Sequence, residues 1–264
     1  MAEQRKNVRR RSRRRRRRAG DRGFLYRLLS LFMICVCVIG ALTMFFRVKS
    51  ILITGLNRYS REDIQTAAQL ADGDNLFFLN KYAMMERIEA ELPYVEQVTI
   101  TRELPDTIHI DVLECDIPLA VVQNETGWLI APGGKIVGRV EETDVAREGY
   151  GIISGCELLS PSVGARIALP SGYAVREESL LALMSALRDA GMMENVDGIR
   201  LDSASYLNMD YAGRFTVRLL YGADYPYKLR ALERYLSDEK IQDNMTGTFD
   251  MTRDDRNFFR QNVR

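Results

Sequence analysis

The chain has 264 residues, of which 28% are charged and 46% are hydrophobic, and its formal net charge at pH 7 is +1. Its four cysteines are too few for a disulfide framework, and its single histidine excludes a metal site built from several histidines. The near-neutral total hides an asymmetry, because residues 1–27 carry a net charge of +11 and the rest of the chain carries −10.

The first segment, residues 1–27, contains a run of arginines from Arg9 to Arg18 that is broken only by Ser12. Such a run repels itself and buries no apolar surface, so we expect a disordered basic tail. Two roles are open for this tail. Beside a membrane it would fix the topology and attract anionic lipids, whereas a free basic peptide would bind nucleic acid.

The second segment is the uncharged stretch LLSLFMICVCVIGALTMFF, residues 28–46. As a helix it would span about 28 Å, close to the ~30 Å hydrocarbon core of a bilayer. A cleaved signal peptide would be shorter and would end in a small-residue site, which residues 43–46 do not offer. We therefore predict a single-pass transmembrane helix in the cell membrane. The positive-inside rule puts the basic tail in the cytoplasm and residues 47–264 outside it.

The first outer domain is expected over residues 47–117. The stretch VKSILITGL predicts a strand, Ser60 with Asp63 predicts a capped helix, and Asn80 predicts the cap of a second helix that stops before Pro93. Residues 94–114 alternate apolar and polar side chains in two runs, which predicts two strands joined by a turn at Pro105. The order strand, helix, helix, strand, strand predicts a two-layer α+β fold.

A second, mixed β-rich domain is expected over residues 118–252. Strands are predicted in PLAVV, GWLIAPGGKIVGRV, GIRLD, YLNMDYAGRFTVRLLYG and TGTFDMT, with helices over residues 177–190 and 225–236. No element is predicted for residues 141–175. Residues 253–264 are expected to form a polar tail with no further strand. One backbone edge of the last predicted strand, residues 246–252, would then stay unpaired, although a plain closing strand is the alternative.

The outer part resembles the cell-division family FtsQ, called DivIB in Gram-positive bacteria. The resemblance rests on the basic tail and single span and on FRVKSILITGLNRYSREDI, NLFFLN and LPYVEQVTITRELPDTIHIDVLE, and it covers about residues 24–252. It implies that the first outer domain is a POTRA domain, a β-α-α-β-β module. It further implies a non-catalytic scaffold at the division septum that helps control septal peptidoglycan synthesis.

The resemblance also implies partners and a binding surface. The partners are the small bitopic coiled-coil proteins FtsL and DivIC (FtsB in other bacteria), with a septal penicillin-binding protein as a further candidate. They would add a strand beside residues 246–252 and the helix at residues 227–236. The candidate contact residues are Tyr227, Tyr235, Thr248, Phe249, Asp250 and Met251, and Phe249 is expected either to fill the core or to touch the partner.

Two other function classes stay open at the level of the sequence. A POTRA-type secretion or assembly factor would bind extended client chains, and a membrane-anchored nucleic-acid binder would use the arginine-rich tail. We do not expect an enzyme, a metal or another cofactor, or specific nucleic-acid binding. His109 and Cys115 are the only candidate base and nucleophile pair, and six residues of strand would hold them about 20 Å apart.

Overall fold

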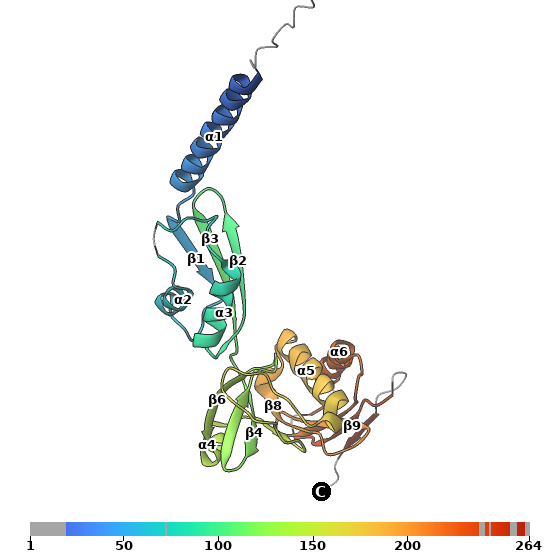
Figure 1. The fold of residues 1–264 in the computed structure, drawn as a ribbon. Coiled ribbons are helices and arrows are strands. Elements are labelled where there is room, and N and C mark those ends of the chain that lie inside the picture. Colours follow the sequence, from blue (N-terminus) through green and yellow to red (C-terminus); the bar gives the residue numbers. More distant parts are fainter. Residues whose placement is uncertain (1–19, 72, 238–240, 243, 254–257, 262–264) are drawn as a thin grey trace, which may run out of the picture.

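The computed structural model describes residues 20–71, 73–237, 241–242, 244–253 and 258–261. The expected disordered tail lies almost wholly outside these residues. Helix α1, Gly20–Phe45, stands apart from two sheet-containing units that follow one another away from its end (Figure 1). Residues 23–45 of α1 are long and apolar enough to cross a membrane. The helix begins earlier than the predicted span and ends at nearly the predicted place.

The unit next to α1, here called the proximal domain, has the predicted order of elements. These are β1 Ser50–Thr54, α2 Arg61–Ala68, α3 Lys81–Glu91, β2 Val95–Glu103 and β3 Thr107–Glu114. Strand β3 is central, with β1 parallel on one side and β2 antiparallel on the other. Both helices cover one face of this sheet (Figure 1).

Local sequence explains the proximal domain well. Ser60 accepts a hydrogen bond from the backbone N–H of Asp63, whose side chain accepts from the backbone N–H of Ser60, so the predicted capping box is present. Asn80 caps α3 through the backbone N–H of Ala83. The apolar residues on the inward face of the two predicted strands are buried, including Ile100 and Ile110, which lie opposite each other.

The unit farther from α1, here called the distal domain, is built on a nine-stranded sheet in the order β12-β11-β10-β9-β8-β7-β4-β5-β6. Its strands are β4 Leu119–Gln123, β5 Thr126–Ile130, β6 Ile136–Glu141, β7 Ile152–Ser154, β8 Val196–Arg200, β9 Tyr206–Tyr211, β10 Phe215–Leu220, β11 Gly247–Asp250 and β12 Phe258–Gln261. Its α-helices are α4 Glu142–Glu148, α5 Ala174–Asp189 and α6 Tyr225–Leu236. Two short 3₁₀ turns, Ser171–Tyr173 and Met193–Asn195, precede α5 and β8.

Helices α5 and α6 cover one face of the larger sheet, and their apolar side chains pack on the strands (Figure 1). The core between them contains Leu183, Leu187, Leu229 and Leu232 from the helices. A smaller cluster on the other face, under α4, includes Leu129 and Val145. The sheet is therefore covered on both faces near β4–β6.

The structure corrects one expectation about the C-terminal residues. The predicted polar tail contains a strand, β12, which pairs antiparallel with β11. The sequence pattern hides it because only Phe259 points into the core, while Phe258 and Arg260 on either side are exposed. With β10 on its other side, β11 has both edges occupied, so the expected unpaired edge is not on this strand.

Candidate partner-binding edge and domain junction

The sheet of the distal domain ends at β12. Within the described residues, no strand pairs with the outer side of β12. A strand at the end of a sheet presents unpaired backbone N–H and C=O groups to any incoming strand. At this end of the sheet the strand that can accept a partner is therefore β12, one strand farther out than the sequence indicates, while β6 forms the other end.

An aromatic cluster holds β12 against the core. The ring of Phe259 lies 4.7 Å from that of Phe249 and 6.2 Å from that of Phe215, measured between centroids. Tyr235 of α6 approaches Phe249 at 6.1 Å. Because aromatic pairs add stabilisation beyond area burial, this cluster ties α6, β10, β11 and β12 into one unit.

A buried lysine fastens the chain where it leaves β11. Lys228 on α6 is 1% exposed, and its Nζ donates to the backbone carbonyl of Arg253 at 2.5 Å. A buried ammonium is costly unless it is hydrogen-bonded, so this contact fixes the backbone at Arg253, just after β11.

The face of this corner that carries no helix is polar. Asp250 lies between Arg218 on β10, at 3.8 Å, and Phe258 on β12. Although burial raises the pKa of Asp250, hydrogen bonds from Thr252 and the charge of Arg218 bring it below its ordinary value. A groove of about 500 Å³ follows this face, lined by Arg218, Thr248, Asp250, Thr252, Arg253, Phe258, Phe259 and Arg260. With three arginines and one carboxylate, the groove is net positive.

The structure separates the six candidate contact residues into two groups. Tyr227 and Tyr235 are exposed on α6, and the side chains of Thr248 and Asp250 line the groove. Phe249 and Met251 are each 1% exposed, which gives Phe249 the core-filling role. Sequence reasoning missed Phe258 and Arg260, for which the only signal was the aromatic pair FF within a charged tail.

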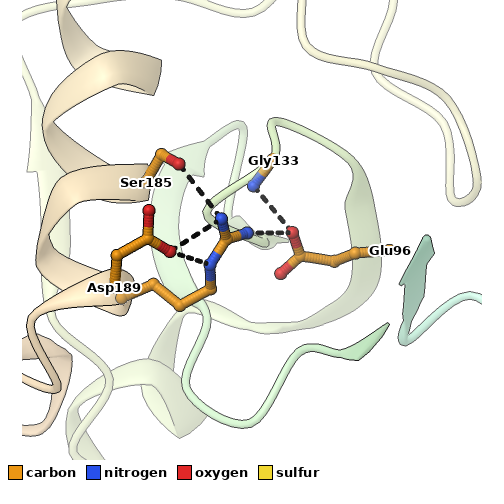
Figure 2. A network of polar contacts seen from close by, with 5 residues as sticks. Glu96, Gly133, Ser185 and Asp189 are labelled. Atoms are coloured by element: carbon orange, nitrogen blue, oxygen red, sulfur yellow. Dashed lines mark hydrogen bonds and ion pairs between the residues drawn. The ribbon is translucent and has the colours of Figure 1, made fainter. Parts of the chain in front are cut away.

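A polar network joins the two domains (Figure 2). The carboxylate of Glu96 on β2 accepts a hydrogen bond from the backbone N–H of Gly133 at 3.0 Å. It also forms an ion pair with Arg188 of α5 at 3.2 Å. Arg188 is held in turn by Ser185 and Asp189. The Glu96 side chain is 4% exposed, and burial raises its pKa above the ordinary value despite the nearby Arg188.

Lys135 adds a second connection at this junction. Its Nζ donates to the backbone carbonyls of Glu89 at 2.5 Å and Val95 at 2.7 Å, both in the proximal domain. Burial lowers its pKa, and the carboxylates of Glu89 and Glu96 oppose that effect. Backbone and side-chain contacts from both domains thus converge on one small area, which restrains how the domains turn relative to each other.

The candidate base and nucleophile do not form a reactive pair. His109 contacts Asp111 at 3.0 Å and Glu103 at 3.5 Å on the polar face of β3. Cys115 is a buried free thiol in the cluster under α4, and burial raises its pKa well above the ordinary value. A thiol is a poor nucleophile when it stays protonated.

Known proteins resemble the proximal domain by itself and also larger parts of the chain. Residues 46–114 match the family profile "POTRA domain, FtsQ-type". The chain is 28% identical over 209 residues to the cell division protein FtsQ of Syntrophotalea carbinolica, a match that covers 75% of this chain and 68% of that relative. It is 25% identical over 216 residues to FtsQ of Geotalea daltonii, covering 81% of this chain and 75% of the relative.

A similar protein also carries the second family name. The cell division protein DivIB of Clostridium botulinum is 34% identical over 115 residues, which is 43% of this chain and 44% of that relative. This match therefore spans less than half of the clostridial protein. The proximal domain is a POTRA domain, and the β-rich distal domain follows it, as the sequence indicates.

Proposed function

Because the chain belongs to the FtsQ/DivIB family of cell division proteins, we propose that it is a non-catalytic scaffold of the division machinery. In this proposal the protein binds other membrane proteins of cell division and helps control septal peptidoglycan synthesis. The partners are FtsL-like and DivIC/FtsB-like coiled-coil proteins that cross the same membrane once. The observation that carries the proposal is the outer edge of β12 beside the exposed side of α6.

Strand addition is the binding mode that this edge favours. An incoming strand would continue the hydrogen-bonded ladder beyond β12, with side chains lying alternately over the groove and beside α6. On the groove side it would meet Phe258 and Arg260, which favours an apolar and an acidic residue two positions apart, in the order set by the direction of the incoming strand. On the other side it would lie near Tyr235.

Charge reversal at the edge tests the proposal with little risk to folding, because Arg260 is exposed. We expect the full chain with Arg260→Glu to recover less of the coiled-coil pair in a crosslinking pull-down from membranes. Arg139→Glu, on the exposed face of β6 at the opposite edge, is the matched control and should recover as much as the wild type. Equal recovery by both variants would place the binding site elsewhere.

The orientation in the membrane is part of the proposal. The charge of +11 on residues 1–27 supports a cytoplasmic N-terminus, because positively charged flanks stay on the cytoplasmic side. A reporter that is active only outside the cytoplasm should work when it is fused after residue 264. If only a cytoplasmic reporter were active at the same position, the topology would be the opposite one, and the scaffold proposal would be wrong.

A further inference from the structure

The end of α1 is built into the proximal domain through one loop. The side-chain amide of Asn75 donates to the carbonyl of Leu42 in the last turn of α1 at 2.9 Å, and the backbone N–H of Leu76 donates to the carbonyl of Phe46 at 2.9 Å. The rings of Phe46 and Phe77 meet edge to face at 4.9 Å. This loop therefore lies at the level where the transmembrane helix ends.

The turn between β2 and β3 reaches the same level. The backbone N–H of Lys49, a few residues after α1, donates to the carbonyl of Asp106 at 2.9 Å, and the Lys49 ammonium pairs with the Asp106 carboxylate at 3.2 Å. The turn lies beside the end of α1 (Figure 1). Arg102, close to this turn, donates to the carbonyl of Leu79 at 2.6 Å and so ties the loop that precedes α3 to the end of β2.

Large apolar side chains are exposed on both of these segments. Phe78 is 72% exposed and Tyr82, in the first turn of α3, is 71% exposed. Leu104, in the turn between β2 and β3, is 60% exposed. Leaving such side chains in water is unfavourable, so a group of them at one end of a domain marks an interaction surface.

We propose that Phe78, Tyr82 and Leu104 form a membrane seat, a surface that inserts into the lipid headgroup region around the end of α1. The occupant is lipid because the surface is continuous with the transmembrane helix, whose last residues Met44 and Phe45 are also exposed. Aromatic side chains are enriched at this depth of a bilayer, where one part of the ring is apolar and the other is wet.

Basic side chains complete the membrane seat. Arg47 and Lys49 follow α1 directly, and the Lys81 ammonium lies 5.2 Å from the centroid of the Tyr82 ring. Lysine and arginine place their charge among lipid phosphates while their stems cover apolar surface. Contacts on two separate segments, besides α1 itself, would fix the tilt of the proximal domain on the membrane. This holds for either orientation of the chain.

Fluorescence of full-length chains in phosphatidylcholine vesicles tests the membrane seat. The chain has one tryptophan, Trp128, so Phe78→Trp and Tyr82→Trp are each made together with Trp128→Phe. The matched control is Val175→Trp in the same background, because Val175 is 63% exposed in the distal domain. Circular dichroism checks that the three variants are folded alike.

We expect emission at shorter wavelength from the Phe78→Trp and Tyr82→Trp chains than from the control. Lipids brominated near the top of the acyl chain should quench these two chains several-fold more than the control, and more than lipids brominated near the chain end. Emission typical of water with no more quenching than the Val175→Trp chain would overturn the proposal. The exposed aromatics would then be free for a protein partner.

Discussion

The alternation of side chains in the strands of the proximal domain predicts which residues matter for stability. Ile110 is 0% exposed at the centre of β3, so Ile110→Ala should lower the free energy of unfolding of this domain by about 2–5 kcal/mol. The neighbouring His109→Ala is the control. Its contacts with Glu103 and Asp111 lie at the surface and contribute about 0–1 kcal/mol.

Urea denaturation of the detergent-solubilised chain, followed by hydrogen exchange in β2 and β3, distinguishes the two variants. Division should be supported by His109→Ala as well as by the wild type. Loss of division activity in a normally folded His109→Ala chain would contradict the proposal that the protein is non-catalytic.

The two cysteines outside α1 are predicted to be unreactive in the folded chain. Burial raises the pKa of Cys156 to about 11 and that of Cys115 further still, so neither is a thiolate at neutral pH. Labelling with iodoacetamide at pH 8 should be slow in the native protein and should accelerate on denaturation, as measured by mass spectrometry of the labelled peptides. Rapid native labelling of Cys115 would show that its surroundings are open.

At the scale of elements, the attachment of β12 depends on one side chain. Phe259 packs against Phe249 on β11 and Phe215 on β10, whereas its neighbour Phe258 is 50% exposed. Phe259→Ala should release β12, at a cost below the ~3–5 kcal/mol of a fully buried phenylalanine because Phe259 is only partly buried. Phe258→Ala should leave β12 in place.

Hydrogen exchange of the amides in β11 and β12 separates these variants. Faster exchange at β12 in the Phe259→Ala chain, with unchanged exchange in the Phe258→Ala chain, is the expected result. Equal exchange in both chains would mean that backbone pairing alone holds the strand. Under the proposed function, the Phe259→Ala chain should also lose the coiled-coil partners.

Sequence patterns were sufficient for elements whose signal is local. The caps at Ser60 and Asn80 gave two helix starts, and alternation gave most of the strands. One of the missed elements, β7, has no local signal. Strand β7 has three residues with one buried side chain, Ile153, and exists because β4 and β8 pair with it on either side.

The candidate site could be predicted from the sequence only in part, for the same reason. The sequence placed the unpaired edge on β11 and not on β12, because the contribution of Phe259 depends on rings that are distant along the chain. The junction residues Glu96 and Arg188 are 92 positions apart, and no pattern in the sequence relates them.

At the scale of the whole molecule, the ion pair of Glu96 and Arg188 should control how firmly the domains are held together. Arg188→Ala leaves a carboxylate that is 4% exposed without its cation, which for a buried pair costs up to about 3–5 kcal/mol. Arg188 is 30% exposed, so we expect the lower part of this range. In the Arg188→Ala chain, the distribution of distances between spin labels on the two domains should broaden.

The pH dependence of this loosening follows from the raised pKa of Glu96. The docked state binds more protons than a separated state between the ordinary pKa and the raised one, so docking weakens as pH rises through that window and then levels off. The Arg188→Ala chain, whose Glu96 pKa should rise further, should show the stronger dependence. The mutation Asp189→Ala removes only an exposed partner of Arg188 and should change the distance distribution little. A pH-independent distribution in the Arg188→Ala chain would contradict this account.

The contacts of Lys135 with the carbonyls of Glu89 and Val95 limit how long the stalk of a membrane-rooted partner can be. Since they restrain the distal domain on the proximal one, they set the height of β12 above the membrane. A partner rooted in the same bilayer must then have a stalk that reaches this height. Inserting one heptad into such a coiled coil would raise its binding strand by about 10 Å, two strand spacings, and put it out of reach of the edge.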